Sequence, residues 1–215
     1  TFECRMDSGS WSNCTSPKSY SSLSEGNHTF QVKATDETGN TGNPKYYNWT
    51  IDITDPITNI SSGPSSLTNS QSATFTFTSN EDDSTFQCAM DTTTWSSCNS
   101  PKSYSSLSEG NHTFYARSID QAGNTGNSSS HIWTIDITAP TSSISLGPSS
   151  LTNNQSGTFQ FSSNEDNSTF QCKIDTGDWS NCTSPMVYAN ISEGDRTFYV
   201  KATDLAGNTG DSDTH

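Results

Sequence analysis

The alternation of apolar and polar residues along the chain predicts short β-strands. Residues 72–78 alternate strictly, with Phe75 and Phe77 on one side and threonines on the other, as in a strand with one buried face. Residues 131–138 alternate similarly, so Trp133, Ile135 and Ile137 are expected to face inward. Further strands are predicted over residues 57–61, 85–90, 95–98, 103–107 and 112–119. Seven short strands at this spacing predict an all-β, seven-strand β-sandwich.

The same pattern recurs at an offset of 84 residues. Thr1-Phe2-Glu3-Cys4 returns as Thr85-Phe86-Gln87-Cys88 and as Thr169-Phe170-Gln171-Cys172, and residues 16–30 recur letter for letter at 100–114. A tandem array of this kind indicates that each unit folds by itself, while the array sets length, spacing and copy number. The layout favours a surface stalk or fibre and requires no catalytic site.

The repeat predicts three domains: residues 1–54 are a partial repeat with strands C to G, 55–138 a complete repeat, and 139–215 a repeat that lacks its last strand. We expect the sequence to be a window of a much longer array. The alternative is a short subunit that polymerises by donor-strand exchange, in which a neighbour supplies the missing strand. The two ends are not cleanly complementary, which weighs against this alternative.

Composition and charge exclude several classes of partner. Only 28% of the residues are hydrophobic and about a third are Ser or Thr, so each core must be thin. The formal net charge of −14 comes with no basic patch, which argues against binding to nucleic acid or to an anionic membrane. No run of apolar residues is long enough to insert into a membrane.

The six cysteines fall into three pairs with one spacing. Nine residues separate the members of each pair: Cys4 and Cys14, Cys88 and Cys98, and Cys172 and Cys182. A zinc site would need closer cysteine pairs or nearby histidines. One disulfide per repeat is therefore predicted, which implies an oxidising compartment. Closing an 11-residue loop contributes about 3 kcal/mol in the chain-entropy picture.

The repeated motif resembles a known family. The pattern TFxCxxDxxxWxxCxSPxxYxxLSEGxHTFxVxAxDxxGNTG, followed by WTIDITxP, resembles the Ig-like, fibronectin-III-like tandem repeats of large prokaryotic (bacterial or archaeal) extracellular adhesins and surface fibres. The resemblance covers essentially the whole chain. It implies tandem sandwiches at the cell surface with an adhesive or structural role, and says little about a ligand.

Oxygen-rich residues gather around the predicted joints between repeats. The linkers at 51–56 and 135–140 are short and stiffened by proline, which suggests a semi-rigid rod. In a sandwich of this order, two loops of one domain lie beside the preceding linker, which gathers the oxygen ligands that Ca²⁺ prefers. The resemblance to calcium-binding adhesin repeats supports the same idea; solvated turn residues are the alternative. The candidate ligands are Asp52, Asp55, Glu81, Asp82, Asp120, Asn124, Asp136, Glu165, Asp166, Asp204 and Asn208.

Ten Asn-x-Ser/Thr sequons suggest a glycoprotein, although each alone is weak evidence. They begin at Asn13, Asn27, Asn48, Asn59, Asn111, Asn127, Asn154, Asn167, Asn181 and Asn190. We expect loop positions to be the better acceptors, and assign Asn27, Asn111, Asn127 and Asn154 to loops.

Other motifs are better explained by structure than by chemistry. Trp11, Trp95 and Trp179 could be sugar-stacking platforms, but we expect them to close the core beside the disulfide. The threonines at 74–78 suggest ice binding, but the counterpart at 158–162 keeps only the first of them, so an ordinary strand face is the expectation. Two histidines, His28 and His112, are replaced by arginine in the third repeat, which argues against a metal or catalytic role. No catalytic grouping stands out, so no enzyme is predicted.

The sequence therefore predicts a structural segment of a long extracellular filament, stalk or adhesin shaft. It would act as a semi-rigid, disulfide-stapled spacer at the cell surface, in contact with neighbouring repeats of the same chain or fibre. The alternative is a module that binds cell-surface glycans or partner cells through exposed loops. No cofactor is required, apart from the calcium considered at the joints.

Overall fold

The computed structural model describes all 215 residues, and its regular structure consists of β-strands. None of the chain forms a helix long and apolar enough to cross a bilayer. The chain divides into two compact units. The first comprises Thr1–Asn59, Ser79–Gln87 and Arg117–Ser128, and the second comprises Ile60–Thr78, Cys88–Ala116 and Ser129–His215.

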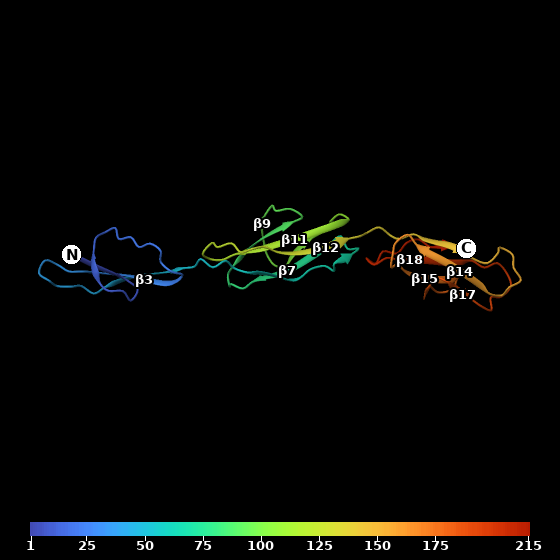
Figure 1. Ribbon diagram of the computed structural model, residues 1–215, viewed down its shortest axis with the longest axis horizontal. Coiled ribbons are helices and arrows are strands. Elements are labelled where there is room, and N and C mark those ends of the chain that lie inside the picture. Colours follow the sequence, from blue (N-terminus) through green and yellow to red (C-terminus); the bar gives the residue numbers. More distant parts are fainter. The chain divides into compact units, whose positions relative to one another are not determined.

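Residues 1–51 form one four-stranded antiparallel sheet in the order β2-β1-β3-β4, whose strand β3 is labelled in the blue part of Figure 1. Its strands are β1 (Phe2–Met6), β2 (Ser12–Cys14), β3 (Gly26–Ala34) and β4 (Lys45–Ile51). Strand β3 lies between β1 and β4, and pairs with each of them over at least five residues.

The middle repeat contains two sheets, in the orders β10-β7-β5 and β6-β12-β11-β8-β9. The strands are β5 (Thr58–Ser62), β6 (Leu67–Thr68), β7 (Ala73–Ser79), β8 (Thr85–Met90), β9 (Ser96–Cys98), β10 (Lys102–Tyr104), β11 (Gly110–Ile119) and β12 (Ser129–Ile135). The third repeat also has two sheets, in the orders β13-β14-β17 and β16-β15-β18-β19. Its strands are β13 (Ser142–Leu146), β14 (Gly157–Ser163), β15 (Thr169–Ile174), β16 (Ser180–Cys182), β17 (Met186–Tyr188), β18 (Phe198–Thr203) and β19 (Asp213–Thr214).

The predicted all-β architecture is confirmed, and five of the seven predicted strands lie within two residues of β5, β7, β8, β9 and β11. The last strand ends at Ile135 and not at residue 138. The prediction that Ile137 faces inward is therefore wrong: its side chain is 42% exposed in the linker. Strand β10 is shorter than expected, and β6, which pairs in parallel with β12, was not predicted.

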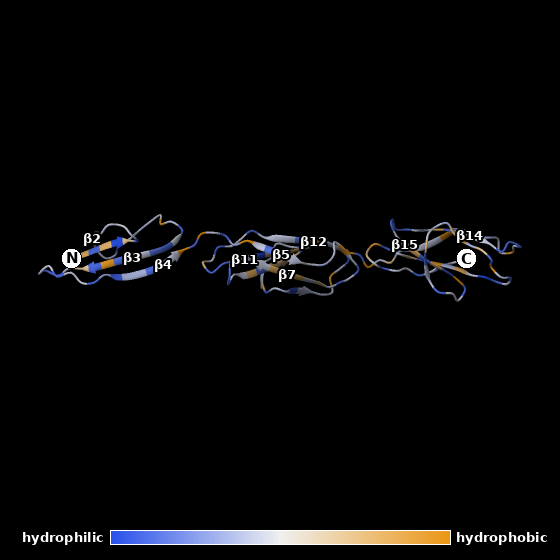
Figure 2. Cartoon of the chain, turned by 90° about the horizontal axis from the view of Figure 1, so that it is seen from below, coloured by the Kyte–Doolittle hydropathy of each residue, from blue (hydrophilic) through white to orange (hydrophobic).

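Stacked aromatic rings form the core of the middle repeat. Phe75 and Phe77 of β7 are almost fully buried, and the ring of Phe75 stacks on Phe114 of β11 with centroids 4.1 Å apart. Trp133 and Ile135 of β12 complete this core. Elsewhere polar residues dominate, and Figure 2 shows mainly blue and white with short orange stretches.

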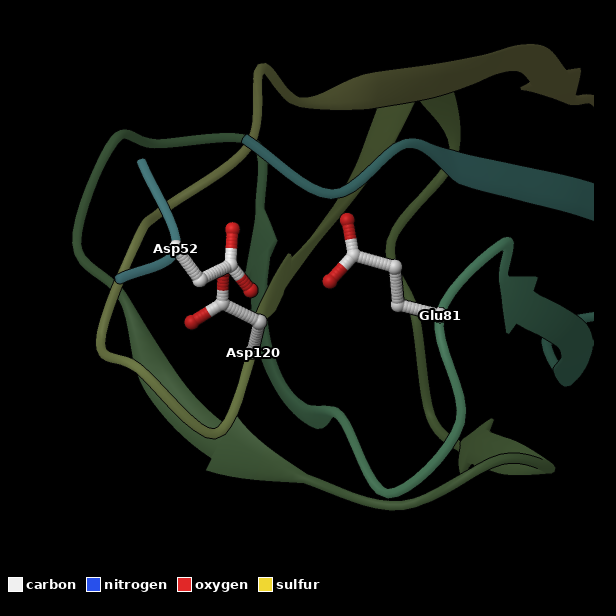
Figure 3. A group of neighbouring side chains, drawn as sticks. All are labelled: Asp52, Glu81 and Asp120. Carbon is white, nitrogen blue, oxygen red and sulfur yellow. The ribbon is translucent and has the colours of Figure 1, made fainter. Parts of the chain in front are cut away.

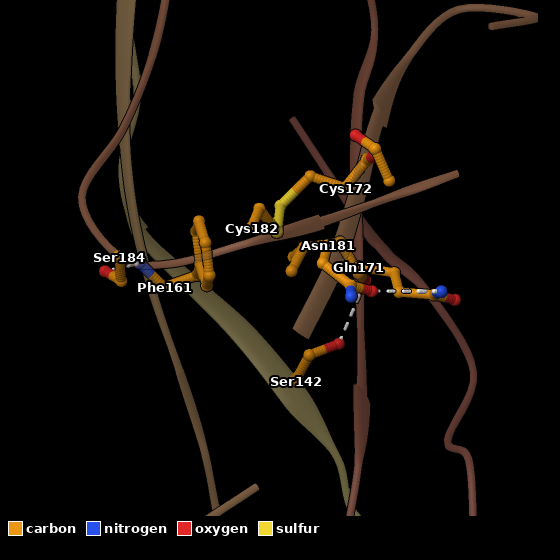
Figure 4. The surroundings of a disulfide bond; sticks show 9 residues. Ser142, Phe161, Gln171, Cys172, Asn181, Cys182 and Ser184 are labelled. Atoms are coloured by element: carbon orange, nitrogen blue, oxygen red, sulfur yellow. Dashed lines mark hydrogen bonds between the residues drawn. A yellow bond between two sulfur atoms is a disulfide. The ribbon is translucent and has the colours of Figure 1, made fainter. Parts of the chain in front are cut away.

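Each repeat has one disulfide, which joins two adjacent strands. The three bonds are Cys4–Cys14, Cys88–Cys98 and Cys172–Cys182. The first cysteine of each pair is at most 3% exposed. In the third repeat the disulfide belongs to the core that contains Phe161 (Figure 4), whose backbone N–H donates to Ser184 Oγ at 2.9 Å. The crosslink thus ties a short edge strand to a thin core.

The expectation that Trp11, Trp95 and Trp179 close the core is wrong. None belongs to the buried core, where the tryptophan is Trp133, at 1% exposure. Basic side chains cover Trp11 and Trp179 on the outer face of the sheet instead. The reason is register: these residues begin the return to the short edge strand, outside the inward series of the central strands.

Candidate metal centre at the repeat joints

The loop after β11 is organised by the carboxylate of Asp120. Its Oδ1 accepts the backbone N–H groups of Gly123 and Asn124 at 2.6 and 2.8 Å, and its Oδ2 accepts from the side chain of Asn124 at 2.8 Å. The same arrangement recurs at Asp204 with Gly207 and Asn208. These loops therefore hold one buried carboxylate in a fixed position at the end of a central strand.

Three carboxylates converge beside the first joint. Asp52 follows β4, Glu81 lies between β7 and β8, and Asp120 follows β11; one oxygen from each lies within 4.8 Å of the others. Figure 3 shows the carboxylates of Asp52 and Asp120 next to each other, with that of Glu81 directed toward them. All three residues belong to the first compact unit.

The second joint repeats this cluster 84 residues later. Asp136, Glu165 and Asp204 bring their carboxylate oxygens within the same 4.8 Å, and all three belong to the second compact unit. No ion pair links any of these six carboxylates to a basic side chain. Each cluster therefore concentrates negative charge that the protein itself does not neutralise.

Hydrogen bonds from asparagine side chains to the linker backbone hold each linker against its loop. The side-chain N–H of Asn124 donates to the backbone carbonyl of Asp52 at 3.1 Å, and that of Asn208 donates to Asp136 at 2.8 Å. A Cβ at Gly126 would lie 1.8 Å from the carbonyl oxygen of Pro56. Glycine is therefore required for the loop to approach this linker so closely.

The clusters shift the ionisation of their members in opposite directions. Burial, and then the charges of Asp52, Asp120 and Glu25, raise the pKa of Glu81 above its usual value. Burial opposes ionisation of Asp120 as well, but hydrogen bonds from the side chain and backbone of Asn124 outweigh it, so the pKa of Asp120 is lowered. Glu165 and Asp204 shift in the same two directions.

The donor set fits a hard divalent cation. Calcium takes carboxylate oxygens at 2.3–2.6 Å, so oxygens on one ion lie at most about 5 Å apart. The 4.8 Å spread within each cluster satisfies this limit. Asp52, Glu81 and Asp120 would hold the ion at the first joint, and Asp136, Glu165 and Asp204 at the second.

The structure brings together only part of the predicted ligand set. Asp55, Asp82 and Asp166 are exposed and lie outside the clusters, and the amide groups of Asn124 and Asn208 serve as hydrogen-bond donors to the linkers. Sequence reasoning missed Glu25 and Glu109, whose charges act on Glu81 and Glu165. Their recurrence in the SEG motif was the available signal.

In every repeat a histidine or arginine contacts an aspartate in the turn after the first central strand and the loop that precedes the next central strand. His112 is 5% exposed, with Nδ1 2.7 Å from the Asp91 carboxylate and Nε2 2.8 Å from the Ser108 carbonyl oxygen. Burial disfavours its charge, but these two acceptors prevail and raise the pKa of His112. His28 has equivalent contacts, and Arg196 reaches Asp175 from the same position in the third repeat. The position thus contributes side-chain hydrogen bonds to an aspartate in all three repeats.

All ten sequon asparagines are exposed. Asn127 and Asn154 lie in loops as expected, whereas Asn27 and Asn111 are the second residues of β3 and β11. Both also accept a hydrogen bond from a threonine hydroxyl of the neighbouring strand. The assignment of these two to loops is therefore wrong, because each strand begins at the glycine before the asparagine.

One protein-family model matches part of the chain. Residues 13–95 match the family model of the bacterial Ig-like domain (group 3). The fibronectin(III)-like modules of CbhA from Clostridium thermocellum align with 74% of this chain and 91% of theirs, at 16% identity and a TM-score of 0.44. No curated protein matches the chain.

Two further solved structures are similar. The FN1-FN3 domains of chicken CNTN1 align with 100% of this chain and 89% of theirs, at 11% identity and a TM-score of 0.39. A tetra-tandem repeat in the extending region of a large adhesion protein aligns with 99% of this chain and 65% of its own, at 19% identity and a TM-score of 0.31. Residues 13–95 are thus similar to bacterial Ig-like domains, and the 84-residue repeat extends the same motif along the chain.

Proposed function

We propose that this chain is a spacer segment of a large extracellular adhesion-type protein, in which Ca²⁺ at the joints restricts the motion of neighbouring repeats. The match of residues 13–95 to bacterial Ig-like domains supports this role. The tandem repeat and the three disulfides support it too, because they suit a polar, thin-cored chain outside the reducing cytosol.

The observation that carries the proposal is the duplication of the carboxylate cluster. Asp120 and Asp204 each end a central strand, and each meets the linker that precedes its own repeat. The equivalent residue of the first repeat, Asp36, has the same loop hydrogen bonds to Asn40, but it belongs to neither cluster. In this chain the clusters thus form at the two joints.

The residues around each cluster indicate how a bound cation would stabilise the joint. Asn124 holds the linker backbone. Burial first, and then the charges of the neighbouring carboxylates, raise the pKa of Glu81, so these carboxylates repel each other when ionised. A bound Ca²⁺ would supply the compensating positive charge. Removal of the ion leaves this repulsion, which favours separation of the linker from the loops.

Calcium titration by isothermal calorimetry tests the metal assignment. We expect two sites per chain with Kd of about 10⁻⁴–10⁻³ M, the range of extracellular modules. Asp120→Asn and Asp204→Asn should each remove one site. Asp36→Asn is the matched control, because it weakens the same loop in a repeat without a cluster and should leave both sites.

Two outcomes would contradict the metal assignment: no binding at millimolar Ca²⁺, or two sites retained in both joint variants. The spacer role has a separate test in the mass of the native polypeptide under reducing, denaturing conditions. A mass many times the 23.2 kDa of this chain is expected for a long array. A discrete species near that mass would favour donor-strand assembly instead.

A further inference from the structure

The sequence shows no basic patch, but strand pairing gathers basic and aromatic side chains on the outer face of the sheet in the third repeat. Cys172 and Val200 point inward and are fully buried, so the alternating residues of β15 and β18 point outward. Lys173 pairs with Tyr199 across the two strands, and Gln171 pairs with Lys201. These four residues therefore share one face of the sheet.

Both lysines lie over the ring of Trp179. The Nζ atoms of Lys201 and Lys173 are 4.6 and 5.1 Å from the centroid of its ring, and that of Lys173 is also 4.9 Å from the ring of Tyr199. The rings of Trp179 and Tyr199 meet edge to face at 6.5 Å. We name this group, Gln171, Lys173, Trp179, Tyr199 and Lys201, the Trp179 platform.

The two lysines lack an acidic partner. Neither forms an ion pair, although the chain has 23 acidic residues against nine basic ones. Asp178, the residue before Trp179, is exposed and does not pair with them. The ammonium groups of Lys173 and Lys201 therefore both contact the Trp179 ring and have no carboxylate paired with them.

The other repeats show how such cations are otherwise satisfied. In the first repeat Arg5 and Lys33 lie over Trp11 at 4.8 and 4.7 Å, but Lys33 pairs with Glu3 at 3.0 Å. Glutamine replaces this glutamate at position 171. The third repeat therefore keeps both cations and loses the carboxylate that could neutralise them.

In the middle repeat one of the two cations is missing. Alanine occupies position 89, the equivalent of Lys173. The remaining cation, Arg117, donates to the side-chain oxygen of Gln87 at 2.7 and 2.9 Å. The Trp179 platform therefore differs from the equivalent groups of the other repeats because it has two basic side chains and no carboxylate paired with them.

We propose that the Trp179 platform binds an acidic polysaccharide through its uronic acid residues. The carboxylate of a uronic acid would pair with Lys173 and Lys201 through charge-assisted hydrogen bonds. The aromatic rings would hold the two ammonium groups in place, and the side-chain oxygen of Gln171, whose N–H donates to Asn181, can accept a hydrogen bond from a hydroxyl. An open sheet face suits an extended polymer better than a small molecule, which usually needs a concave pocket.

This inference goes beyond the spacer role and does not depend on calcium. Binding by one platform is expected to be weak, and a polymer gains avidity when it engages several copies. Because the site is exposed, affinity should fall as ionic strength rises.

Titration of the full chain with oligogalacturonate, followed by NMR shifts of the Trp179 indole N–H, tests the proposal. The double substitution Lys173→Met and Lys201→Met should weaken binding about tenfold or more through loss of two charge-assisted contacts. The matched control is Lys18→Met with Lys102→Met. These lysines lie over Tyr20 and Tyr104 at 5.4 and 5.3 Å, so the net charge changes equally, and affinity should stay within about twofold.

Competing probes separate the class of ligand. A neutral oligosaccharide of equal length should not bind, and polyglutamate should bind more weakly than oligogalacturonate. Equal binding of polyglutamate would overturn the glycan assignment in favour of an acidic peptide, and equal losses in both double variants would overturn the site. Absence of binding at millimolar oligogalacturonate would overturn the whole inference. Melting temperatures of both variants verify that they remain folded.

Discussion

Gly126 provides a sharp test of the joint because the equivalent glycines of the three repeats differ in what an added Cβ would meet. A Cβ at Gly126 would lie 1.8 Å from the Pro56 carbonyl oxygen, and one at Gly210 would lie 1.7 Å from that of Pro140. At Gly42, the equivalent residue of the first repeat, the nearest atom is 3.8 Å away. Substitution by alanine therefore requires the backbone to move at Gly126 and Gly210, whereas at Gly42 an added Cβ makes only an ordinary contact.

The magnitude follows from the displacement that alanine would require. Ordinary contact begins at 3.4 Å, so Pro56 and the loop must separate by about 1.6 Å, and overpacking of this kind costs about 1–3 kcal/mol. The backbone N–H of Gly126 also donates to Ser118 at 3.0 Å, which resists this shift. Gly42→Ala should instead be neutral or stabilising by about 0.4–1 kcal/mol, because alanine restricts the unfolded chain.

Native-state hydrogen exchange, resolved by mass spectrometry, measures the opening of β11 and β3 separately in the intact chain. We expect Gly126→Ala to accelerate exchange in β11 by about 5- to 150-fold, and Gly42→Ala to leave exchange in β3 unchanged or slower. Equal effects of the two substitutions on their own strands would refute the close approach of loop and linker.

Three further predictions concern the middle repeat. Phe75→Ala should destabilise it by about 3–5 kcal/mol in chemical denaturation, whereas the exposed Thr74→Ala should change little; equal effects would contradict the assigned core face. Replacement of Cys88 and Cys98 by serine should cost about 2–4 kcal/mol by the same assay, and an unchanged midpoint would show that the crosslink is dispensable. The folded pKa of His112 is raised, so its stabilising charge is fully present below the unfolded pKa near 6.5 and is lost as the pH rises through the folded value. Exchange in β11 should therefore accelerate beyond the intrinsic pH effect as the pH rises above about 6.5 and through the folded pKa, and His112→Arg, which keeps its charge, should abolish this excess.

The strands of the middle repeat could be predicted because their patterns are strong. Strict alternation around Phe75 and Phe77 identifies β7 and its buried face, and the cysteine spacing anticipates the pairing of β8 with β9. Ile137 continues the alternation of β12 into the linker, where no strand pairs with it, so the pattern alone extends the strand too far. The two-residue strand β6 is too short to leave a periodic signal.

The candidate site was predictable as a neighbourhood but not as a set of ligands. Loop order in the sandwich places Asp52, Glu81 and Asp120 together, yet it cannot distinguish Glu81 from the adjacent Asp82, because side-chain direction in a loop depends on its backbone conformation. The outward position of Trp179 was missed for a related reason. A tryptophan beside a cysteine suggests a core, and only the register of the return strand shows that it faces solvent.

The central claim is that a cation at the joint restricts the motion of neighbouring repeats. Residual dipolar couplings of backbone amides in β3 and β11 test it most directly, since these strands lie in consecutive repeats. In millimolar Ca²⁺ we expect one alignment tensor to fit both sets of couplings, and in chelator two different tensors. Asp120→Asn should give the chelator result even with Ca²⁺ present. Separate tensors under all conditions, or one tensor under all of them, would contradict a cation-dependent joint.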